Sequence, residues 1–328
     1  MAGFALLQTH EIKGFEEFRE VVAGAPREVV QIQKGMLSGR LSHALIDGLR
    51  IDTASFNLGL RTKGVSGADG VVIGMLADST DRVTRFSYES CPGDVLVTPP
   101  GTEHENRYYG GSKVIIASIR SEDISSSFAC EGELSDPAAW RRSHYKGNAH
   151  TVQSVVPRLQ SLVARLGNAP LTAESADFWK RAVIEAMSAN IVQGRSSERD
   201  GPRPSALKIV RQVEEYLDEA GPGPVHISKI CSYMHLPRRT LHRAFQEALG
   251  IGPIAFLKHR RLCSAHTALR LPRDSRTISD IALHYGFQSL GRFSGHYHRM
   301  FGEYPSETRR ARRTPHQNGS PRIESPQP

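Results

Sequence analysis

The chain has 328 residues, 39 % of them hydrophobic and 23 % charged, which is typical of a soluble globular protein of one or two domains. It contains no run of about 18 apolar residues, and its first ten residues lack the pattern of a signal peptide, so we expect no membrane span. The four cysteines are scattered without a CxxC pair, which favours reduced thiols in the cytoplasm over disulfides or a zinc site.

The positive charge is concentrated in one part of the chain. Residues 203–313 hold 19 Lys and Arg against 9 Asp and Glu, whereas the rest of the chain holds 23 against 25. A concentrated positive field suits a polyanionic partner, because each neutralised phosphate releases a condensed counterion. A solvated cationic surface would have the same composition, so the motifs must decide between the two.

Short apolar segments recur between residues 29 and 119, separated by Gly, Pro and Asp turn signals. They lie at residues 41–46, 70–76, 94–98 and 113–117. Their length and their content of β-branched residues predict an all-β barrel or sandwich, which we place in a sensor domain at residues 1–150.

One segment of this region is similar to the second motif of the cupin barrels, Gly-x5-Pro-x-Gly-x-x-His. It begins at Gly93 and ends at His104, and it predicts a strand, a rigid turn and a histidine directed into the barrel mouth. The earlier His-x-His of metal cupins is absent, and one ligand cannot hold a metal ion, so we expect neither a metal nor another cofactor. Candidate effector-binding residues are Glu103, His104, Glu105 and Asn106; alternatively, they lie on a solvated turn.

The pattern becomes helical from residue 151 to residue 193. Apolar residues fall at helical spacing at Val152, Val155, Val156, Leu159, Leu162, Val163 and Leu166, and a second helix is predicted at residues 174–192. These helices either pack on the barrel of their own chain or pair with a second subunit in a homodimer. Residues 194–204 are polar and rich in Gly and Pro, which indicates a linker.

A weak internal repeat follows the linker. Its copies span residues 227–250 and 278–302, and each predicts a short helix, a turn and a second helix. Small residues, Cys231 and Ala282, stand where the two helices cross. The buried positions of the second helices correspond, since Leu241, Phe245 and Leu249 match Phe293, Tyr297 and Phe301.

Three further features support two helix-turn-helix units. Gly286 precedes the second turn, where a left-handed backbone is needed, and Thr277 with Asp280 resembles a capping box. An arginine-rich helix at residues 254–271 would hold the units at a fixed separation. The last fifteen residues, 314–328, contain four prolines and little to bury, so we expect them to be disordered.

The exposed face of the first unit carries side chains that can donate hydrogen bonds to bases or phosphates. These are Arg238, Arg239, His242 and Arg243. They would also serve as solubilising residues on an amphipathic helix. Because the same unit occurs twice in a basic segment, the pattern favours DNA binding.

The second copy resembles the signature of the AraC/XylS transcription regulators. The resemblance rests on the pattern Ile281-Ala282-x3-Gly286-Phe287-x-Ser289-x3-Phe293-x7-Phe301-Gly302-x-x-Pro305-Ser306-x-x-Arg309, and it covers residues 205–313. It implies two helix-turn-helix units joined by a helix, binding to double-stranded promoter DNA, contact with RNA polymerase and a small-molecule effector for the N-terminal domain.

The resemblance also implies which residues read DNA. In the first unit they are Arg239, His242 and Arg243, and in the second they are Leu290, Gly291, Ser294 and Gly295. Gly295 stands where many members have Arg, and Tyr297 and His298 stand where Phe and Lys are common. We therefore expect the second unit to contribute mainly backbone contacts, through Arg292, His298 and Arg299.

The sequence thus predicts an α+β multidomain regulator, with a cupin-like β-barrel, flanking helices and an all-α DNA-binding domain. An effector-responsive activator is favoured. The alternatives are a cupin-type metalloenzyme with an appended DNA-binding module and a non-specific architectural DNA binder. The absence of a Gly-x-Ser-x-Gly elbow and of a phosphate-binding loop argues against an enzyme.

Overall fold

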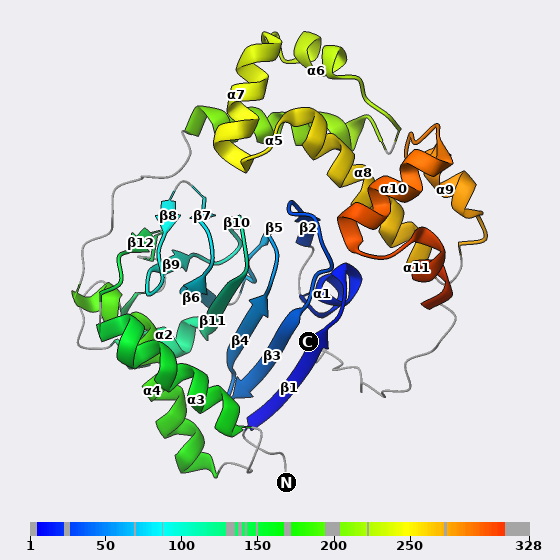
Figure 1. Cartoon of the computed structure of the whole chain (residues 1–328). Coiled ribbons are helices and arrows are strands. Elements are labelled where there is room, and N and C mark those ends of the chain that lie inside the picture. Colours follow the sequence, from blue (N-terminus) through cyan, green and yellow to red (C-terminus); the bar gives the residue numbers. More distant parts are fainter. Residues whose placement is uncertain are drawn as a thin grey trace.

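A computed structural model describes residues 5–22, 27–68, 70–86, 88–128, 135–136, 140–141, 143–148, 150–166, 172–193, 204–221, 223–271 and 274–311. Two antiparallel sheets and their flanking helices form the N-terminal part, and a helical part lies across one of the sheets (Figure 1). The α+β class and the order of a β-rich region followed by helices are as predicted from the sequence. The proposed linker up to residue 203 and the proposed tail lie outside the described residues.

The sheets face each other, and residues of both line a cavity between them. The seven-stranded sheet has the order β1-β3-β4-β11-β6-β9-β12 and the five-stranded sheet the order β2-β5-β10-β7-β8. The strands of the first are β1 (Ala5–Ile12), β3 (Gly39–Ile46), β4 (Leu49–Phe56), β6 (Gly70–Ser79), β9 (Val95–Thr98), β11 (Ser112–Arg120) and β12 (Ser143–Tyr145). Those of the second are β2 (Arg27–Gln31), β5 (Leu60–Val65), β7 (Val83–Arg85), β8 (Tyr88–Ser90) and β10 (Glu103–Tyr108). Each of the four apolar segments singled out in the sequence coincides with a strand, except that Asp94 lies just before β9.

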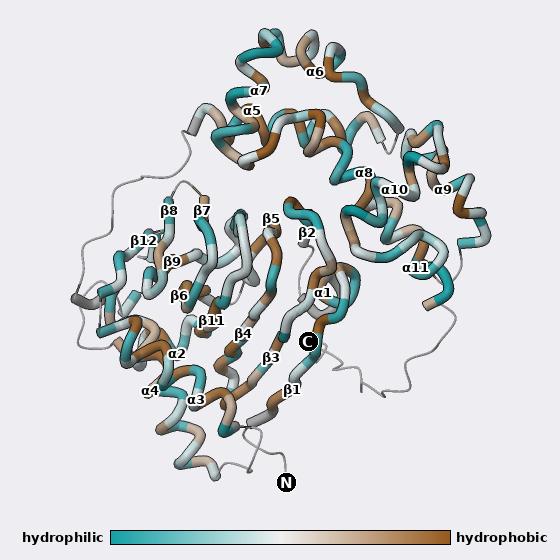
Figure 2. Tube along the Cα trace, viewed as in Figure 1, coloured by the Kyte–Doolittle hydropathy of each residue, from teal (hydrophilic) through white to brown (hydrophobic). Residues whose placement is uncertain are grey.

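Helices cover the outer face of the seven-stranded sheet. They are α2 (Ser121–Ser127), a π-helical turn (Thr151–Val155), α3 (Val156–Leu166) and α4 (Ala173–Gln193), while α1 (Phe15–Val22) packs beside β1 and β2. Figure 2 shows hydrophobic stretches of α3 and α4 beside the sheet. Val156, Leu159 and Val163 are buried there against strands of their own chain, which is the first of the two arrangements considered for this stripe.

The predicted stripe is wrong at Val152, which is 36 % exposed. The wider π-helical turn at residues 151–155 rotates the start of the stripe, so that Thr151 takes the buried position instead. The Thr151 hydroxyl group forms a hydrogen bond of 3.1 Å with Asn190 of α4, which ties this turn to the next helix.

The helical part contains both predicted helix-turn-helix units. After α5 (Pro204–Glu219), the first unit is α6 (Ile227–Tyr233) with α7 (Arg238–Leu249), and the second is α9 (Ile278–His284) with α10 (Leu290–Phe301). The connecting helix is α8 (Pro253–Arg270), and α11 (Pro305–Ala311) follows the second unit. The Thr277–Asp280 capping box is present, and Gly286 has the left-handed φ of 78° that its turn requires. A Cβ at Gly286 would lie 2.6 Å from the side chain of Pro224.

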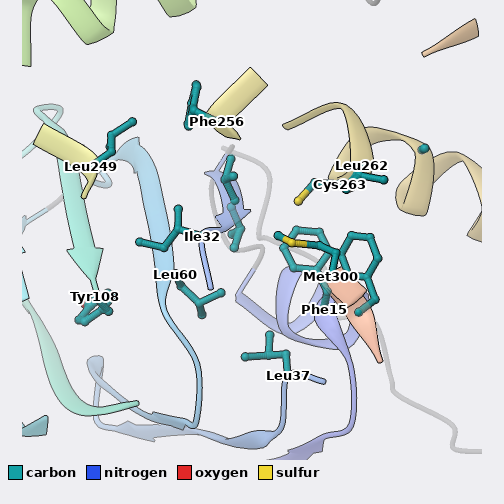
Figure 3. Close-up of a cluster of buried hydrophobic side chains, with 14 of the residues drawn as sticks. Phe15, Ile32, Leu37, Leu60, Tyr108, Leu249, Phe256, Leu262, Cys263 and Met300 are labelled. Atoms are coloured by element: carbon teal, nitrogen blue, oxygen red, sulfur yellow. The ribbon is translucent and has the colours of Figure 1, made fainter. Parts of the chain in front are cut away.

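One hydrophobic core joins the helical part to the five-stranded sheet. Leu249 of α7, Phe256 of α8 and Met300 of α10 pack with Ile32 and Leu60 of the N-terminal part (Figure 3). The backbone also connects the two parts, because the Gly35 amide donates to the carbonyl of Met300 at 3.1 Å. The helical part and the five-stranded sheet therefore share one hydrophobic core and a backbone hydrogen bond.

Candidate DNA interface and effector cavity

The outward face of α7 is basic and open to solvent. Leu241, Phe245 and Leu249 are each 0 % exposed and fix which side of the helix is buried. The predicted readers Arg238, Arg239, His242 and Arg243 are all exposed. Gln246 is exposed on the same face, one turn after Arg243, and was missed in the sequence, although an amide at this spacing suits an adenine edge.

The outward face of α10 is poor in side chains that could read bases. A Cβ added at Gly291 or Gly295 would meet no atom within 4 Å, so the helix surface at these two positions is open and carries no side chain. Leu290 is 45 % exposed, Ser294 is half-buried and Arg292 is exposed.

The basic edge of α10 has its own contacts. The His298 ring stacks on Tyr304 with the ring centroids 4.3 Å apart, and the His298 Nδ1 atom is buried. The Arg299 guanidinium is exposed and lies 2.6 Å from the ring of His296. The structure therefore leaves Arg292 and Arg299 as the more accessible cations of this helix.

The departure at Tyr297 is explained by buried hydrogen bonds. The Tyr297 hydroxyl group contacts His266 of α8 and lies 2.8 Å from the Thr308 hydroxyl group of α11. Tyr297→Phe is expected to destabilise the fold by about 1–2 kcal/mol, because two buried polar groups lose a partner. Chemical denaturation measures this change. Tyr304→Phe, at a residue that is 47 % exposed, is the matched control, and an equal loss in both variants would contradict the assignment.

A cavity of about 320 Å³ lies between the two sheets. Its wall includes His104 and Asn106, two of the four residues singled out as effector-binding candidates. Both belong to β10, so the segment forms a strand and not a solvated turn. Glu103 borders a separate depression that Arg260 of α8 also lines, and Glu105 faces the helical part. Among the described residues, no group of three or more His, Cys, Asp and Glu could hold a metal ion.

Alternate residues of β5 and β10 lie on opposite faces of the five-stranded sheet, one face toward the cavity and the other toward the helical part. On β10, His104, Asn106 and Tyr108 line the cavity, whereas Glu105 and Arg107 take part in a buried ion cluster next to the helical part. The neighbouring strand β5 has the same arrangement, with Thr62 on the cavity wall and Arg61 in the cluster. Two strands therefore carry the cavity on one face and the domain contact on the other.

Arg61 is the centre of this cluster. Its guanidinium donates to Glu105 at 2.8 Å and to Glu214 of α5 at 2.6 Å, and Arg107 donates to Glu105 at 2.5 Å. Glu28 of β2 lies 3.8 Å from Arg61. Arg61 and Glu214 are 1 % and 2 % exposed at their side chains, so this pair is fully desolvated.

The two glutamates of the cluster differ in their protonation. Burial raises the pKa of the Glu105 carboxyl, but the charges and hydrogen bonds of Arg61 and Arg107 outweigh burial and lower that pKa to about 2. For Glu214, burial prevails over the attraction of Arg61 and raises the pKa to about 7, with Glu28 and Glu105 adding to the rise. Glu214 therefore takes up a proton near neutral pH in the folded chain.

We expect the stability of the folded chain to fall between pH 5 and pH 7 because of Glu214. In this range the folded state binds a proton that the unfolded state, with a Glu pKa near 4.5, has lost, so rising pH favours unfolding. Glu214→Gln should remove about 2 kcal/mol of this dependence. Urea denaturation of both chains across the range measures it, and parallel profiles would contradict the shift.

Several side chains of the ion cluster and the cavity escaped sequence reasoning. Arg61 and Glu214 are 153 residues apart, so no local pattern links them. Arg85 lies in a strand of three residues, too short for a periodic signal, yet it lines the cavity. No local signal marks Arg61, because β5 reads Leu-Arg-Thr-Lys-Gly-Val and holds a second cation, Lys63.

Comparisons with known proteins found relatives of the helical part and of most of the chain. A profile described as "Helix-turn-helix domain" matches residues 230–311. The chain is 24 % identical over 290 residues to XylDLEGF operon transcriptional activator 1 of Pseudomonas putida, a match that covers 84 % of this chain and 86 % of the relative. It is 34 % identical over 107 residues to the probable thc operon regulatory protein of Rhodococcus erythropolis, covering 32 % of each chain.

Two solved structures are also similar. A probable AraC family transcriptional regulator from Rhodopseudomonas palustris is 39 % identical, and the match covers 33 % of this chain and 99 % of that one with a TM-score of 0.31. The AraC-like transcriptional activator CuxR is 16 % identical, with coverage of 79 % and 95 % and a TM-score of 0.43. No described helix is long and apolar enough to cross a membrane.

Proposed function

Since the chain belongs to the AraC/XylS family of DNA-binding transcription regulators, we propose that it activates transcription when a small effector binds between its two sheets. The observation that carries this proposal is the double role of β5 and β10. An effector that contacts Thr62 or Asn106 touches the strands that hold Arg61 and Glu105 against the helical part.

The switch requires that the effector bind one arrangement of the two parts more tightly than another. Such a difference in affinity shifts the population of arrangements, and by linkage DNA binding then changes effector affinity in turn. The ion cluster and the Gly35–Met300 backbone contact connect the two parts in this arrangement, and they are the contacts that a second arrangement would have to change. The first unit supplies base recognition through α7, and the second holds the DNA backbone through Arg292 and Arg299.

The proposal is tested by selecting genomic DNA fragments with purified full-length protein at physiological salt and footprinting the fragments that bind. Protection of a few discrete sites supports a sequence-specific regulator. Recovery of random fragments, with binding that collapses as salt rises, would indicate phosphate contacts alone and favour an architectural protein. Transcription from a selected promoter with RNA polymerase then separates activation from repression.

A further inference from the structure

Arg85 is a buried cation on the cavity wall. It is 3 % exposed, and no carboxylate of the described residues lies within ion-pair distance of its guanidinium. Its Nη1 donates to the carbonyl of Gly74 on the opposite sheet at 2.7 Å, while Nε has no hydrogen-bond partner. Burial lowers the pKa of Arg85, opposed by Tyr108 and Asp94. An arginine remains charged in proteins, so this site holds one positive charge without a partner.

The close approach of Arg85 to the opposite sheet depends on a glycine. A Cβ at Gly74 would lie 2.3 Å from the Arg85 Nη2 atom, so any side chain there would displace the guanidinium. Gly74 therefore provides the space that the Arg85 guanidinium occupies on the cavity wall.

Arg85 belongs to a row of polar residues that crosses the five-stranded sheet. Asn106 lies directly opposite Arg85 in the β10–β7 register and directly opposite Thr62 in the β10–β5 register. All three line the cavity, and cross-strand neighbours of this kind have their Cβ atoms about 5 Å apart. The Oδ1 atom of Asn106 is buried without a hydrogen-bond partner, so the row offers an acceptor beside the unpaired cation.

Outside the polar row, the cavity wall carries both apolar and ion-paired side chains. The apolar ones are Phe18, Leu41, Phe56, Leu96, Val114 and Ile116. His43, Arg50 and Arg120 also line the cavity, but the first two pair with Asp52 and the third pairs with Asp123, so their charges have partners. A ligand that fills this space needs an apolar body beside the apolar side chains and a polar group that reaches Arg85.

We propose that the effector is a small organic acid with one carboxylate, which binds the Arg85 guanidinium and places its apolar body against the seven-stranded sheet. This inference rests on the proposed function and names the class of its effector. A single carboxylate matches the single unpaired cation, whereas a dianion would leave a buried negative charge uncompensated. A neutral ligand would leave Arg85 without a counter-charge.

The test compares acids with their neutral amides by calorimetric titration of the full chain. The probes are hexanoate and 3-phenylpropionate, each paired with its amide. We expect each acid to bind about tenfold or more tightly than its amide, and Arg85→Met to abolish that preference. Arg85→Lys keeps the positive charge but lacks the planar guanidinium that binds a carboxylate through two hydrogen bonds, so it should retain only part of the preference for the acid. This variant replaces Arg85→Met in the test if the Met variant does not fold. Arg82→Met is the matched control, because Arg82 is exposed and lies outside the cavity.

Each outcome bears on a separate claim. Equal binding of acid and amide, binding of neither, or an acid preference that survives Arg85→Met would overturn the inference. If the chain still protects discrete DNA sites in that case, its role as a regulator stands and only the effector class is wrong. An acid preference in a chain that recovers random DNA would instead support the cavity assignment and contradict sequence-specific regulation.

Discussion

Arg61→Met is expected to lower the free energy of unfolding by about 3–5 kcal/mol, the usual cost of removing one partner from a buried ion pair. The reason is desolvation: Glu214 stays buried after the change, and it loses a guanidinium that lies 2.5 Å away. The measurement is urea denaturation at pH 8, above the raised pKa of Glu214, where its carboxylate is charged.

The double variant Arg61→Met/Glu214→Met separates a buried charge from lost packing. It removes both charges of the pair and leaves Glu105 with Arg107, which donates to it at 2.5 Å. We expect the double variant to be more stable than Arg61→Met, because an apolar pair replaces an unpaired carboxylate. If Arg61→Met unfolds within about 1 kcal/mol of the unmodified chain, the ion cluster does not hold the two parts together.

The helix-turn-helix units could be predicted because their burial is local. In α7, the residues at i, i+4 and i+8 from Leu241 all lie on one side of a single helix, and the structure buries each of them. The capping box at Thr277 and the left-handed Gly286 are likewise decided within a few residues. The same holds for the four strand segments, whose apolar residues are flanked by turn signals.

The cavity and the ion cluster depend on pairings that no local pattern contains. The sequence places Glu103, His104, Glu105 and Asn106 in one candidate group. Alternate residues of a strand lie on opposite faces, however, so only His104 and Asn106 line the cavity. Arg85 becomes a candidate only once the β10–β7 register places it beside Asn106. Val152 was misplaced for a different reason, since a π-helical turn does not follow the 3.6-residue period.

The two recognition helices should respond differently to the loss of their arginines. Arg239 and Arg243 lie on the exposed basic face of α7, whereas α10 presents bare glycines where base-reading side chains would stand. Arg239→Ala/Arg243→Ala is expected to reduce the preference for a selected DNA site over scrambled DNA by roughly 30-fold to 10⁴-fold, because each bidentate contact contributes about 1–3 kcal/mol of discrimination.

The matched variant Arg292→Ala/Arg299→Ala removes the same number of charges from α10. It should weaken binding to both DNAs by a similar factor and reduce the slope of log affinity against log salt by about 2, since two phosphate contacts are lost. Competition binding at several salt concentrations measures preference and slope together. The opposite result, with preference lost in the α10 variant and retained in the α7 variant, would assign base reading to the second unit. The positive charge of a helix would then not predict which helix recognises bases. Leu290 and Ser294 would be the residues to substitute next, because apolar and hydroxyl side chains also discriminate bases.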